Sequence, residues 1–242
     1  MGPRVMAALR WLGLGFWAFS FLTSIGTLLY LAGFVHNRYS FNTIDSGLQI
    51  PTREAIVVNL ALLALFGLQH SGMARRRFKR FVPAPLERAV YLLATSLALA
   101  ILFVRWEPMP DPVWFFNTKW PFRILLALSA IIVTWAAASQ GALHFFGFHP
   151  IWAWVRGRAS SAPAFKAPGL YRYTRHPMMI GTLLFLWATP DLTQGHALFS
   201  AVMTAYVLLA VRWEERDLEQ THGDAYRDYR RRVTRYLRLP MQ

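Results

Sequence analysis

Apolar residues occur along the chain in long runs that are separated by short polar stretches. Four of these runs occupy residues 9–35, 55–69, 89–104 and 122–148. A helix of about 20 apolar residues crosses a hydrocarbon core that is roughly 30 Å thick. Each run therefore predicts a membrane-spanning helix.

Two further apolar runs lie on either side of a short polar tip. Residues 178–190 and 196–213 are almost entirely apolar, and D-L-T-Q-G at 191–195 is typical of a turn. This pattern predicts an antiparallel helical hairpin and brings the number of crossings to about six, with five to six as the range. The predicted fold class is all-α, a polytopic integral membrane helical bundle.

The last stretch, residues 216–238, has a different pattern. Its charges are dense, and Tyr226, Tyr229, Val233 and Tyr236 recur at spacings of three or four residues. This spacing predicts a C-terminal amphipathic helix on the cytoplasmic face of the membrane. Such a helix either lies on the headgroups or covers the charged residues at the base of the hairpin.

Composition and charge support a membrane location. Hydrophobic residues make up 55% of the chain and charged residues 16%, whereas a soluble domain has about a quarter charged. All but five of the 26 Lys and Arg flank the runs on one side, and Lys and Arg are retained on the cytoplasmic side. We therefore expect an inner-membrane protein with both termini cytoplasmic. The five others are Arg38, Arg53, Arg105, Lys119 and Arg123.

The net charge of +14 raises the alternative of nucleic-acid binding. Membrane topology and attraction to anionic headgroups explain the same basic clusters. We therefore expect membrane lipid, and no nucleic acid, as a partner. The chain has no cysteine, which excludes disulfides, thiolate metal ligands and a cysteine nucleophile, and no metal site is expected.

The two ends of the predicted hairpin carry charges that must lie near each other. R-H-P-M-M-I-G at 175–181 precedes it, and Glu214 and Glu215 follow it. A cluster of this kind suits a ligand that has both a cationic and an anionic part. The alternative is a topological anchor, because Pro177 is also well suited to the start of a helix.

Three other polar residues lie near the cytoplasmic ends of apolar runs. Gln69 and His70 close the second run, and His144 lies about one turn inside the end of the fourth. Polar and ionisable side chains at membrane depth are often functional. The alternative for Gln69 and His70 is that they reach interfacial water.

Several motifs of the chain resemble those of known membrane enzymes. R-H-P-x-x-x-G, a short helical hairpin, E-E and H-G-x-x-Y-x-x-Y resemble the isoprenylcysteine carboxyl methyltransferase and phospholipid methyltransferase superfamily, which uses S-adenosylmethionine (SAM). The resemblance is closer to the methanethiol S-methyltransferase (NnrU-related) family. It rests on I-D-S-G (44–47), L-F-G-L-Q-H-S-G-M-A (65–74), Y-R-Y-T-R-H-P-M-M-I-G (171–181), W-A-T-P-D-L-T-Q-G-H (187–196) and E-E-R-D-L (214–218).

The resemblance implies a fold, a reaction and a set of site residues. It covers nearly the whole chain and implies one membrane methyltransferase domain over 1–242, with spans in 9–148 and a SAM-binding hairpin and tail in 168–242. The implied reaction methylates a small apolar thiol, methanethiol, to dimethyl sulfide, with Gln69, His70 and His144 as candidates for the catalytic site. The residues implied for SAM are Leu170, Tyr173, Arg175, His176, Pro177, Gly181, Glu214 and Glu215.

Other functions remain open at this point. The methanethiol family tends to read N-H-F-D where this chain has G-A-L-H at 141–144. The acceptor could thus be another thiol, a prenylcysteine carboxylate or a lipid. A non-catalytic membrane protein that binds a cofactor or assists assembly is the alternative from a different class. The sequence does not indicate an oligomeric state.

Overall fold

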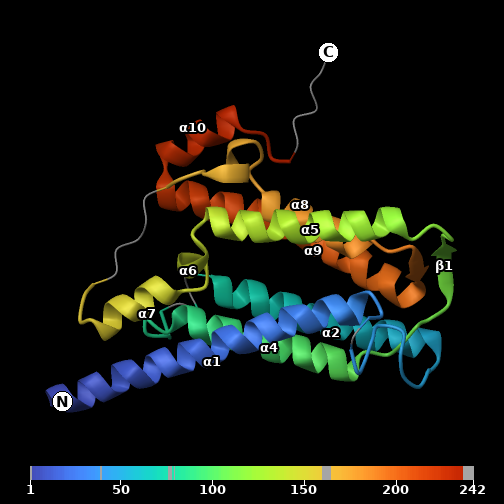
Figure 1. Ribbon diagram of the computed structural model, residues 1–242, viewed down its shortest axis with the longest axis horizontal. Helices are drawn as coiled ribbons and strands as arrows, with labels where there is room; N and C mark the ends of the chain where they lie inside the picture. The colour runs from blue at the N-terminus through green and yellow to red at the C-terminus, as the bar shows by residue number, and fades with distance from the viewer. Residues whose placement is uncertain (1, 39, 76–77, 79, 160–164, 237–242) are drawn as a thin grey trace. The chain divides into compact units, whose positions relative to one another are not determined.

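The computed structural model describes residues 2–38, 40–75, 78, 80–159 and 165–236, and these residues are mainly helical (Figure 1). The chain divides into two compact units. Unit 1 comprises Met1–Asp111, Leu143–Ser161 and Thr193–Phe199, and unit 2 comprises Pro112–Ala142, Ala162–Leu192 and Ser200–Gln242.

Unit 1 is built on three long helices. Helix α4 packs along both α1 and α2, and the short helix α7 packs on α1. Proline stands at the first position of α1, where its missing N–H is not needed. The helices of this unit are α1 (Pro3–Val35), α2 (Thr52–Ala74), α4 (Glu87–Arg105), α6 (Ala142–Phe145) and α7 (Phe148–Val155).

Buried aromatic rings and one amide hold unit 1 together near the end of α4. The ring of Phe34 lies 5.0 Å from that of Phe103 and 6.1 Å from that of Trp106. The fully buried Asn59 donates to the Glu107 carbonyl at 2.8 Å and accepts from the Glu107 N–H at 3.0 Å. Both ends of this amide are therefore paired, as burial requires.

Unit 2 is built on α5, α8 and the larger part of α9. Helix α5 packs along α8 and against the 3₁₀ helix η1, and β1 pairs with β2 in a two-stranded sheet. The elements are β1 (Pro112–Phe115), α5 (Trp120–Ser139), η1 (Gly169–Arg172), α8 (Pro177–Trp187), β2 (Asp191–Thr193), α9 (Gln194–His222) and α10 (Asp224–Arg232).

Helices α5 and α8 approach each other closely at Gly181. A Cβ atom at this position would lie 2.7 Å from Val133 Cγ2 and 3.1 Å from the Ser129 carbonyl oxygen. A side chain would therefore push the two helices apart, and small residues are common where membrane helices pack.

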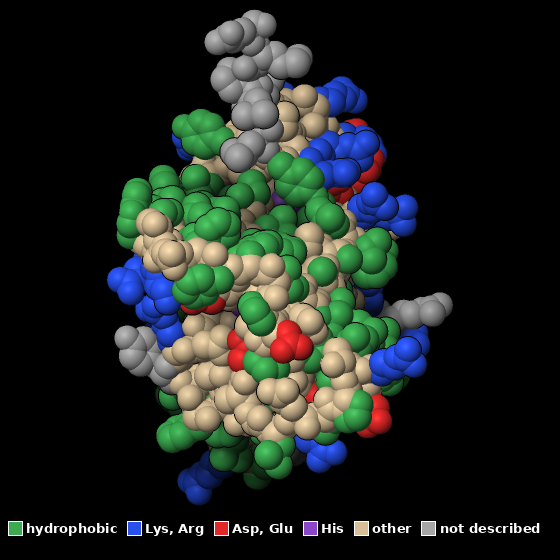
Figure 2. Space-filling view, turned by 90° about the vertical axis from the view of Figure 1, so that its right-hand side faces the viewer, with side chains coloured by type: hydrophobic (Ala, Val, Ile, Leu, Met, Phe, Trp, Pro, Cys, Tyr) green, Lys and Arg blue, Asp and Glu red, His purple; other side chains and the backbone are tan. Residues whose placement is uncertain are grey.

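The fold class predicted from the sequence is confirmed. Among the described residues, α1, α2, α4, α5 and α9 are long and apolar enough to cross a membrane, and α8 is a shorter apolar helix. With 11 residues, α8 extends only about 16 Å at 1.5 Å per residue. The predicted first arm, residues 178–190, is therefore helical only as far as Trp187, and non-helical residues lead from there to β2. Large hydrophobic side chains are exposed along α1, α2 and α5, as lipid contact requires. Hydrophobic side chains also lie on the face that Figure 2 shows.

The helix predicted over residues 122–148 is interrupted by glycines. Helix α5 ends at Ser139, and Gly141 and Gly147 adopt φ of 79° and 82°. Residues that have a side chain rarely adopt this left-handed backbone conformation, whereas glycine does so at little cost. The chain breaks there into the short helices α6 and α7.

The predicted C-terminal amphipathic helix is present but shorter than expected. Residues 216–222 continue α9, Gly223 breaks the helix at φ 54°, and α10 ends at Arg232. Tyr226 and Tyr229 of α10 are buried, whereas Arg227 and Arg231 are exposed. Residues 237–238 of the predicted helix lie outside the described part of the chain.

Candidate active site

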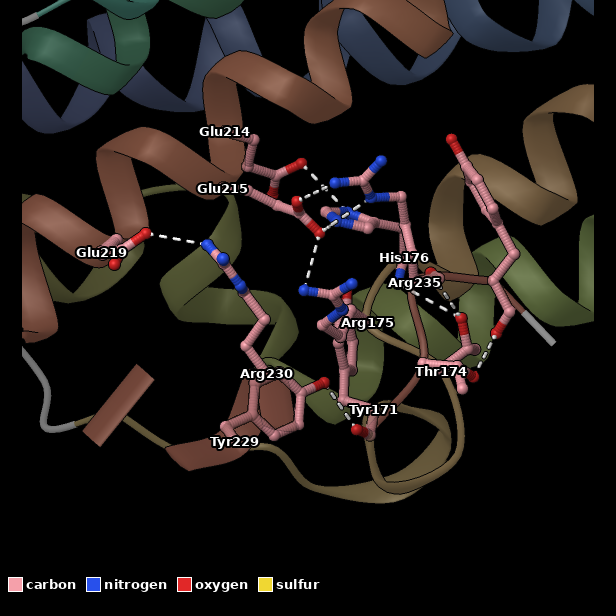
Figure 3. Close-up of polar contacts among 12 residues, drawn as sticks. Tyr171, Thr174, Arg175, His176, Glu214, Glu215, Glu219, Tyr229, Arg230 and Arg235 are labelled. Carbon is pink, nitrogen blue, oxygen red and sulfur yellow. Dashed lines mark hydrogen bonds and ion pairs between the residues drawn. The ribbon is translucent and has the colours of Figure 1, made fainter. Parts of the chain in front are cut away.

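Five charged or ionisable side chains meet in unit 2 in what we call the ion-pair cluster, formed by Arg175, His176, Glu214, Glu215 and Arg235 (Figure 3). Both glutamates come from the last turns of α9. Arg175 and His176 precede α8, and Arg235 follows α10. Three separate segments of unit 2 thus converge on one point.

Glu215 is the centre of the ion-pair cluster. Its side chain is 6% exposed, and its Oε1 lies 3.1 Å from Arg175 Nη1 and 3.2 Å from His176 Nε2. Arg235 donates from Nε to Oε1 at 3.2 Å and from Nη2 to Oε2 at 2.7 Å. A buried carboxylate requires such partners, because an uncompensated charge is costly away from water.

Glu214 lies on the open side of the same cluster. Its side chain is 48% exposed, and its Oε2 is 3.4 Å from Nδ1 of His176. Each ring nitrogen of His176 therefore faces a carboxylate: Nδ1 faces Glu214 and Nε2 faces Glu215. Both nitrogens are donors at once only in the protonated ring.

Backbone contacts hold the segments of the cluster in register. The Arg175 N–H donates to the Thr234 carbonyl at 3.0 Å, and the Thr174 hydroxyl donates to the Arg235 carbonyl at 3.1 Å. Pro177 is buried and begins α8, so the helix starts directly after His176. The tail after α10 is thereby fixed against the loop that carries Arg175 and His176.

Aromatic side chains line the ion-pair cluster. Tyr229 is 7% exposed, and its hydroxyl donates to the Tyr171 carbonyl at 2.6 Å. The ring of Phe165 lies 5.7 Å from that of Tyr226 and 5.2 Å from that of Tyr229. Burial raises the pKa of Tyr229 far above its usual value, so its hydroxyl remains a neutral donor.

Three buried polar atoms of the cluster make no hydrogen bond of good geometry among the described residues. These are the Tyr226 hydroxyl oxygen, Arg175 Nε and Arg175 Nη1, of which Nη1 forms an ion pair with Glu215 Oε1 at 3.1 Å. Burial and then the charge of Glu215 raise the pKa of Tyr226, whereas the nearby Arg175 opposes that rise. Arg175 is thus a neighbour of this hydroxyl, and a side-chain hydrogen bond from Arg175 also lowers the pKa of Tyr226. Because buried polar groups are almost always paired, these donors can bind an acceptor group of a ligand.

The structure brings together only some of the residues expected to bind the cofactor. Arg175, His176, Glu214 and Glu215 form one cluster, and Pro177 adjoins it. The other three do not join the ion pairs. Leu170 lies in η1, Tyr173 after it is 73% exposed, and Gly181 faces α5.

Arg235 and Thr174 belong to the cluster but were not among the residues expected from the sequence, whereas Tyr226 was expected only as part of a helix that could cover the base of the hairpin. Arg235 is one of many arginines in a basic tail, so composition does not single it out. The adjacent glutamates were the available signal, because carboxylates beside a membrane span need cationic partners.

Gln69 and His70 belong to a second group in unit 1, the polar cluster, together with Tyr91 and Thr95 of α4. The Tyr91 hydroxyl lies 2.8 Å from His70 Nε2 and 3.0 Å from Nδ1. Gln69 Nε2 donates to Thr95 Oγ1 at 3.4 Å and to Met73 Sδ at 3.1 Å. Gln69 Oε1 is buried and has no donor among the described residues.

His144 lies on α6, beyond the end of α5, rather than inside a long span as predicted. Its side chain is half-buried, and its ring is 5.8 Å from that of His149. The break at Gly141 accounts for this position. His144 therefore comes from a different element than the polar cluster of α2 and α4.

Comparison with known proteins assigns the chain to a family. The family described as "Protein of unknown function (DUF1295)" matches residues 85–233. Methanethiol S-methyltransferase 2 of Bradyrhizobium diazoefficiens is 43% identical over 216 residues, which cover 86% of this chain and 82% of the relative.

Two further relatives carry the same name. Methanethiol S-methyltransferase of Pseudomonas sp. is 42% identical over 215 residues, covering 86% of this chain and 82% of that relative. The enzyme of Mycobacterium tuberculosis is 38% identical over 240 residues, covering 96% and 98%. No solved structure matches the chain significantly. The chain belongs to the DUF1295 family and to the family of the methanethiol S-methyltransferases.

Proposed function

We propose that the protein transfers a methyl group from SAM to methanethiol and so forms dimethyl sulfide. The observation that carries this proposal is the identity of 38–43% to methanethiol S-methyltransferases along most of the chain. We treat residues 1–242 as one methyltransferase domain whose donor-binding residues lie in 168–242. The names of the relatives specify the acceptor, and the choice of SAM as donor is part of the proposal.

The ion-pair cluster fits a ligand with the charges of SAM. Arg175 Nε and the Tyr226 hydroxyl are buried donors that can form hydrogen bonds to an acceptor such as the carboxylate of SAM. Glu214 is half exposed and offers an oxygen to an ammonium group or to ribose hydroxyls. When bound, SAM supplies a methyl group on a positively charged sulfonium.

Glu215 has a different role from that of Glu214 in this proposal. Its two oxygens are already engaged by Arg175, His176 and Arg235. We therefore assign Glu215 to holding these three side chains in place, and we assign direct contact with the donor to Arg175, His176, Glu214 and Tyr226.

The polar cluster of unit 1 fits the needs of a thiol acceptor. An ordinary thiol has a pKa of about 8.5 or more and reacts as the thiolate. His70 or His144 removes the proton, and Gln69 Oε1 is a buried acceptor toward which an S–H group can point. Alignment of the two reactants and exclusion of water supply the remaining acceleration.

We further propose that the protein lies in the bacterial inner membrane with both termini cytoplasmic. The support is the distribution of Lys and Arg, all but five of which flank the spans on one side. Reporter fusions after Gln242 should be active only in the cytoplasm. A periplasmic C-terminus would put the tail with Arg235 on the wrong side for a cytoplasmic donor.

The test is a headspace assay with purified protein, SAM and a panel of acceptors. The panel contains methanethiol, ethanethiol, hydrogen sulfide, a prenylcysteine and a phospholipid. We expect dimethyl sulfide and S-adenosylhomocysteine in equal amounts, with methanethiol as the best acceptor. Preference for the prenylcysteine or the phospholipid would replace the thiol proposal, and SAM binding without any methylation would indicate a non-catalytic protein.

A further inference from the structure

Arg88 ends the polybasic stretch of residues 74–88 between the second and third apolar runs, but its side chain does not project from a surface loop. It lies in the first turn of α4, and its guanidinium carbon is 5.4 Å from the centre of the Tyr91 ring and 5.0 Å from that of Phe145. Its Nε donates to the Phe145 carbonyl at 2.7 Å. The guanidinium is therefore held by two rings and a carbonyl oxygen.

The segment that follows α6 leaves room for Arg88 in this position. A Cβ atom on Gly147 would lie 2.5 Å from Arg88 Cβ and 2.6 Å from its Cγ. Gly147 also has φ of 82°, so a side chain there would be strained as well as crowded. A single glycine thus allows α6 to lie directly against the start of α4.

Arg88 connects the two histidines considered as bases. Tyr91, whose ring faces the guanidinium, places its hydroxyl 2.8 Å from His70 Nε2. Phe145, whose carbonyl accepts from Arg88, is the residue next to His144 in α6. One fixed cation therefore contacts neighbours of both His70 and His144.

We propose that Arg88 stabilises the thiolate form of the acceptor, an inference that rests on the proposed function. In the reaction, the S–H proton passes to a histidine and the acceptor sulfur forms a bond to the methyl carbon. The bond from that carbon to the donor sulfur breaks, and its electron pair stays on the donor sulfur, which becomes a neutral thioether. The anion that precedes bond formation is costly in an apolar site unless a cation lies near it.

Arg88 is suited to this role because its charge is permanent. The titratable groups that interact with it are Glu87 and Tyr91 on α4 and His70 on α2, and His144 precedes Phe145, whose carbonyl Arg88 contacts. A guanidinium remains protonated at every pH at which an enzyme works. It therefore favours the thiolate without itself exchanging a proton.

The competing explanation is that Arg88 only ties α4 to α6 through its bond to Phe145. Arg88→Lys keeps the positive charge but loses the Nε–H donor, whereas Arg88→Gln loses the charge. A purely structural role predicts similar losses in both variants. Charge stabilisation predicts that only Arg88→Gln changes the pH dependence of methylation.

The experiment measures kcat/KM for methanethiol from pH 6 to 10 with purified full-length protein and saturating SAM. In Arg88→Gln we expect the half-maximal pH to rise by about one unit, which is about a tenfold loss at neutral pH that recovers at high pH. Arg88→Lys should keep the wild-type profile. Arg105→Gln, an exposed arginine at the other end of α4, is the matched control.

A second acceptor sharpens the result. An aryl thiol that is already ionised at pH 7 should be methylated by Arg88→Gln with much less than a tenfold loss. Equal losses for both acceptors, or an unshifted pH profile in Arg88→Gln, would overturn the role of Arg88 while leaving thiol methylation intact. An inactive wild-type protein would instead overturn the proposed function and this inference with it.

Discussion

The ion-pair cluster of unit 2 and the polar cluster of unit 1 differ in the number of charged side chains that they contain. The first joins two carboxylates to two guanidinium groups and an imidazole, with Glu215 buried at its centre. The second consists of an amide, an imidazole and two hydroxyls, with Arg88 beside Tyr91. One is an ionic assembly, and the other is mainly a neutral hydrogen-bonding group.

This difference matches the two molecules of the proposed reaction. SAM carries several charges, and fixed charges of both signs can replace part of the water that it loses on binding. Methanethiol is small and uncharged, and it becomes an anion only when it reacts. A buried ionic cluster costs desolvation energy, so we expect it where a charged ligand binds and not where an apolar thiol does.

The largest effect is expected when the centre of the ionic cluster is neutralised. Glu215→Gln leaves Arg175, His176 and Arg235 without their buried carboxylate, so we expect a loss of about 3 kcal/mol or more in stability and loss of SAM binding. Thermal unfolding in detergent measures the loss of stability, and calorimetric titration measures the loss of SAM binding. Glu219→Gln removes a carboxylate that is 34% exposed and pairs with Arg230, and it should cost less than about 1 kcal/mol. Similar effects in both variants would contradict a central role for Glu215.

The next largest effect is expected in the neutral cluster. If His70 removes the thiol proton, His70→Ala should lower turnover at neutral pH by about 100-fold, the low end of the range for a general base. Activity should recover partly at high pH, where the thiolate forms unaided, and SAM affinity should not change. His144→Ala is measured in parallel, since the same result there would assign the base to α6. Losses that are independent of pH in both variants would exclude either histidine as the base.

A smaller effect is expected where single contacts to the donor are removed. His176→Ala and Glu214→Gln should each weaken SAM binding by about 1 to 3 kcal/mol, the usual loss for one hydrogen bond to a charged group. Circular dichroism should show an intact helical fold. Unchanged affinity in both variants would locate the donor away from the ion-pair cluster.

The smallest effect is expected at the aromatic wall. Tyr229→Phe removes the hydrogen bond to the Tyr171 carbonyl and should cost about 1 kcal/mol of stability. Because the folded-state pKa of Tyr229 is raised, its contribution is complete below pH of about 10 and is lost as pH rises above that value. The difference between wild type and Tyr229→Phe should thus be constant from pH 7 to 9 and shrink above 10. A difference that grows with pH would contradict the buried, neutral phenol.

The spans and the paired ends of the hairpin could be predicted from the sequence. Hydrocarbon admits few charges, so apolar runs mark α1, α2, α4 and α5 within a few residues at most ends. The hairpin pattern likewise predicted that His176 and Glu215 lie together, as the structure confirms. These predictions succeed because both rest on the same large free-energy cost, that of placing polar groups in lipid.

The remaining features depend on local conformation and packing, which a hydrophobic pattern does not reveal. Gly141 lies in an apolar window, and glycine is common in membrane helices, so the end of α5 could not be predicted there. Arg235 reaches Glu215 only because Gly223 turns the chain back after α9. The burial of Arg88 depends on the space beside Gly147. Each case is decided by a backbone angle or by contact between distant segments.

The central claim is direct methyl transfer from SAM to methanethiol, and an isotope experiment tests it most directly. Purified protein is supplied with SAM that carries a CD3 group and with unlabelled methanethiol. The account predicts dimethyl sulfide with one CD3 group per molecule, formed in equal amount to S-adenosylhomocysteine, and less of both products with His176→Ala when SAM is kept below saturation. Unlabelled dimethyl sulfide, or S-adenosylhomocysteine without a methylated thiol, would contradict it.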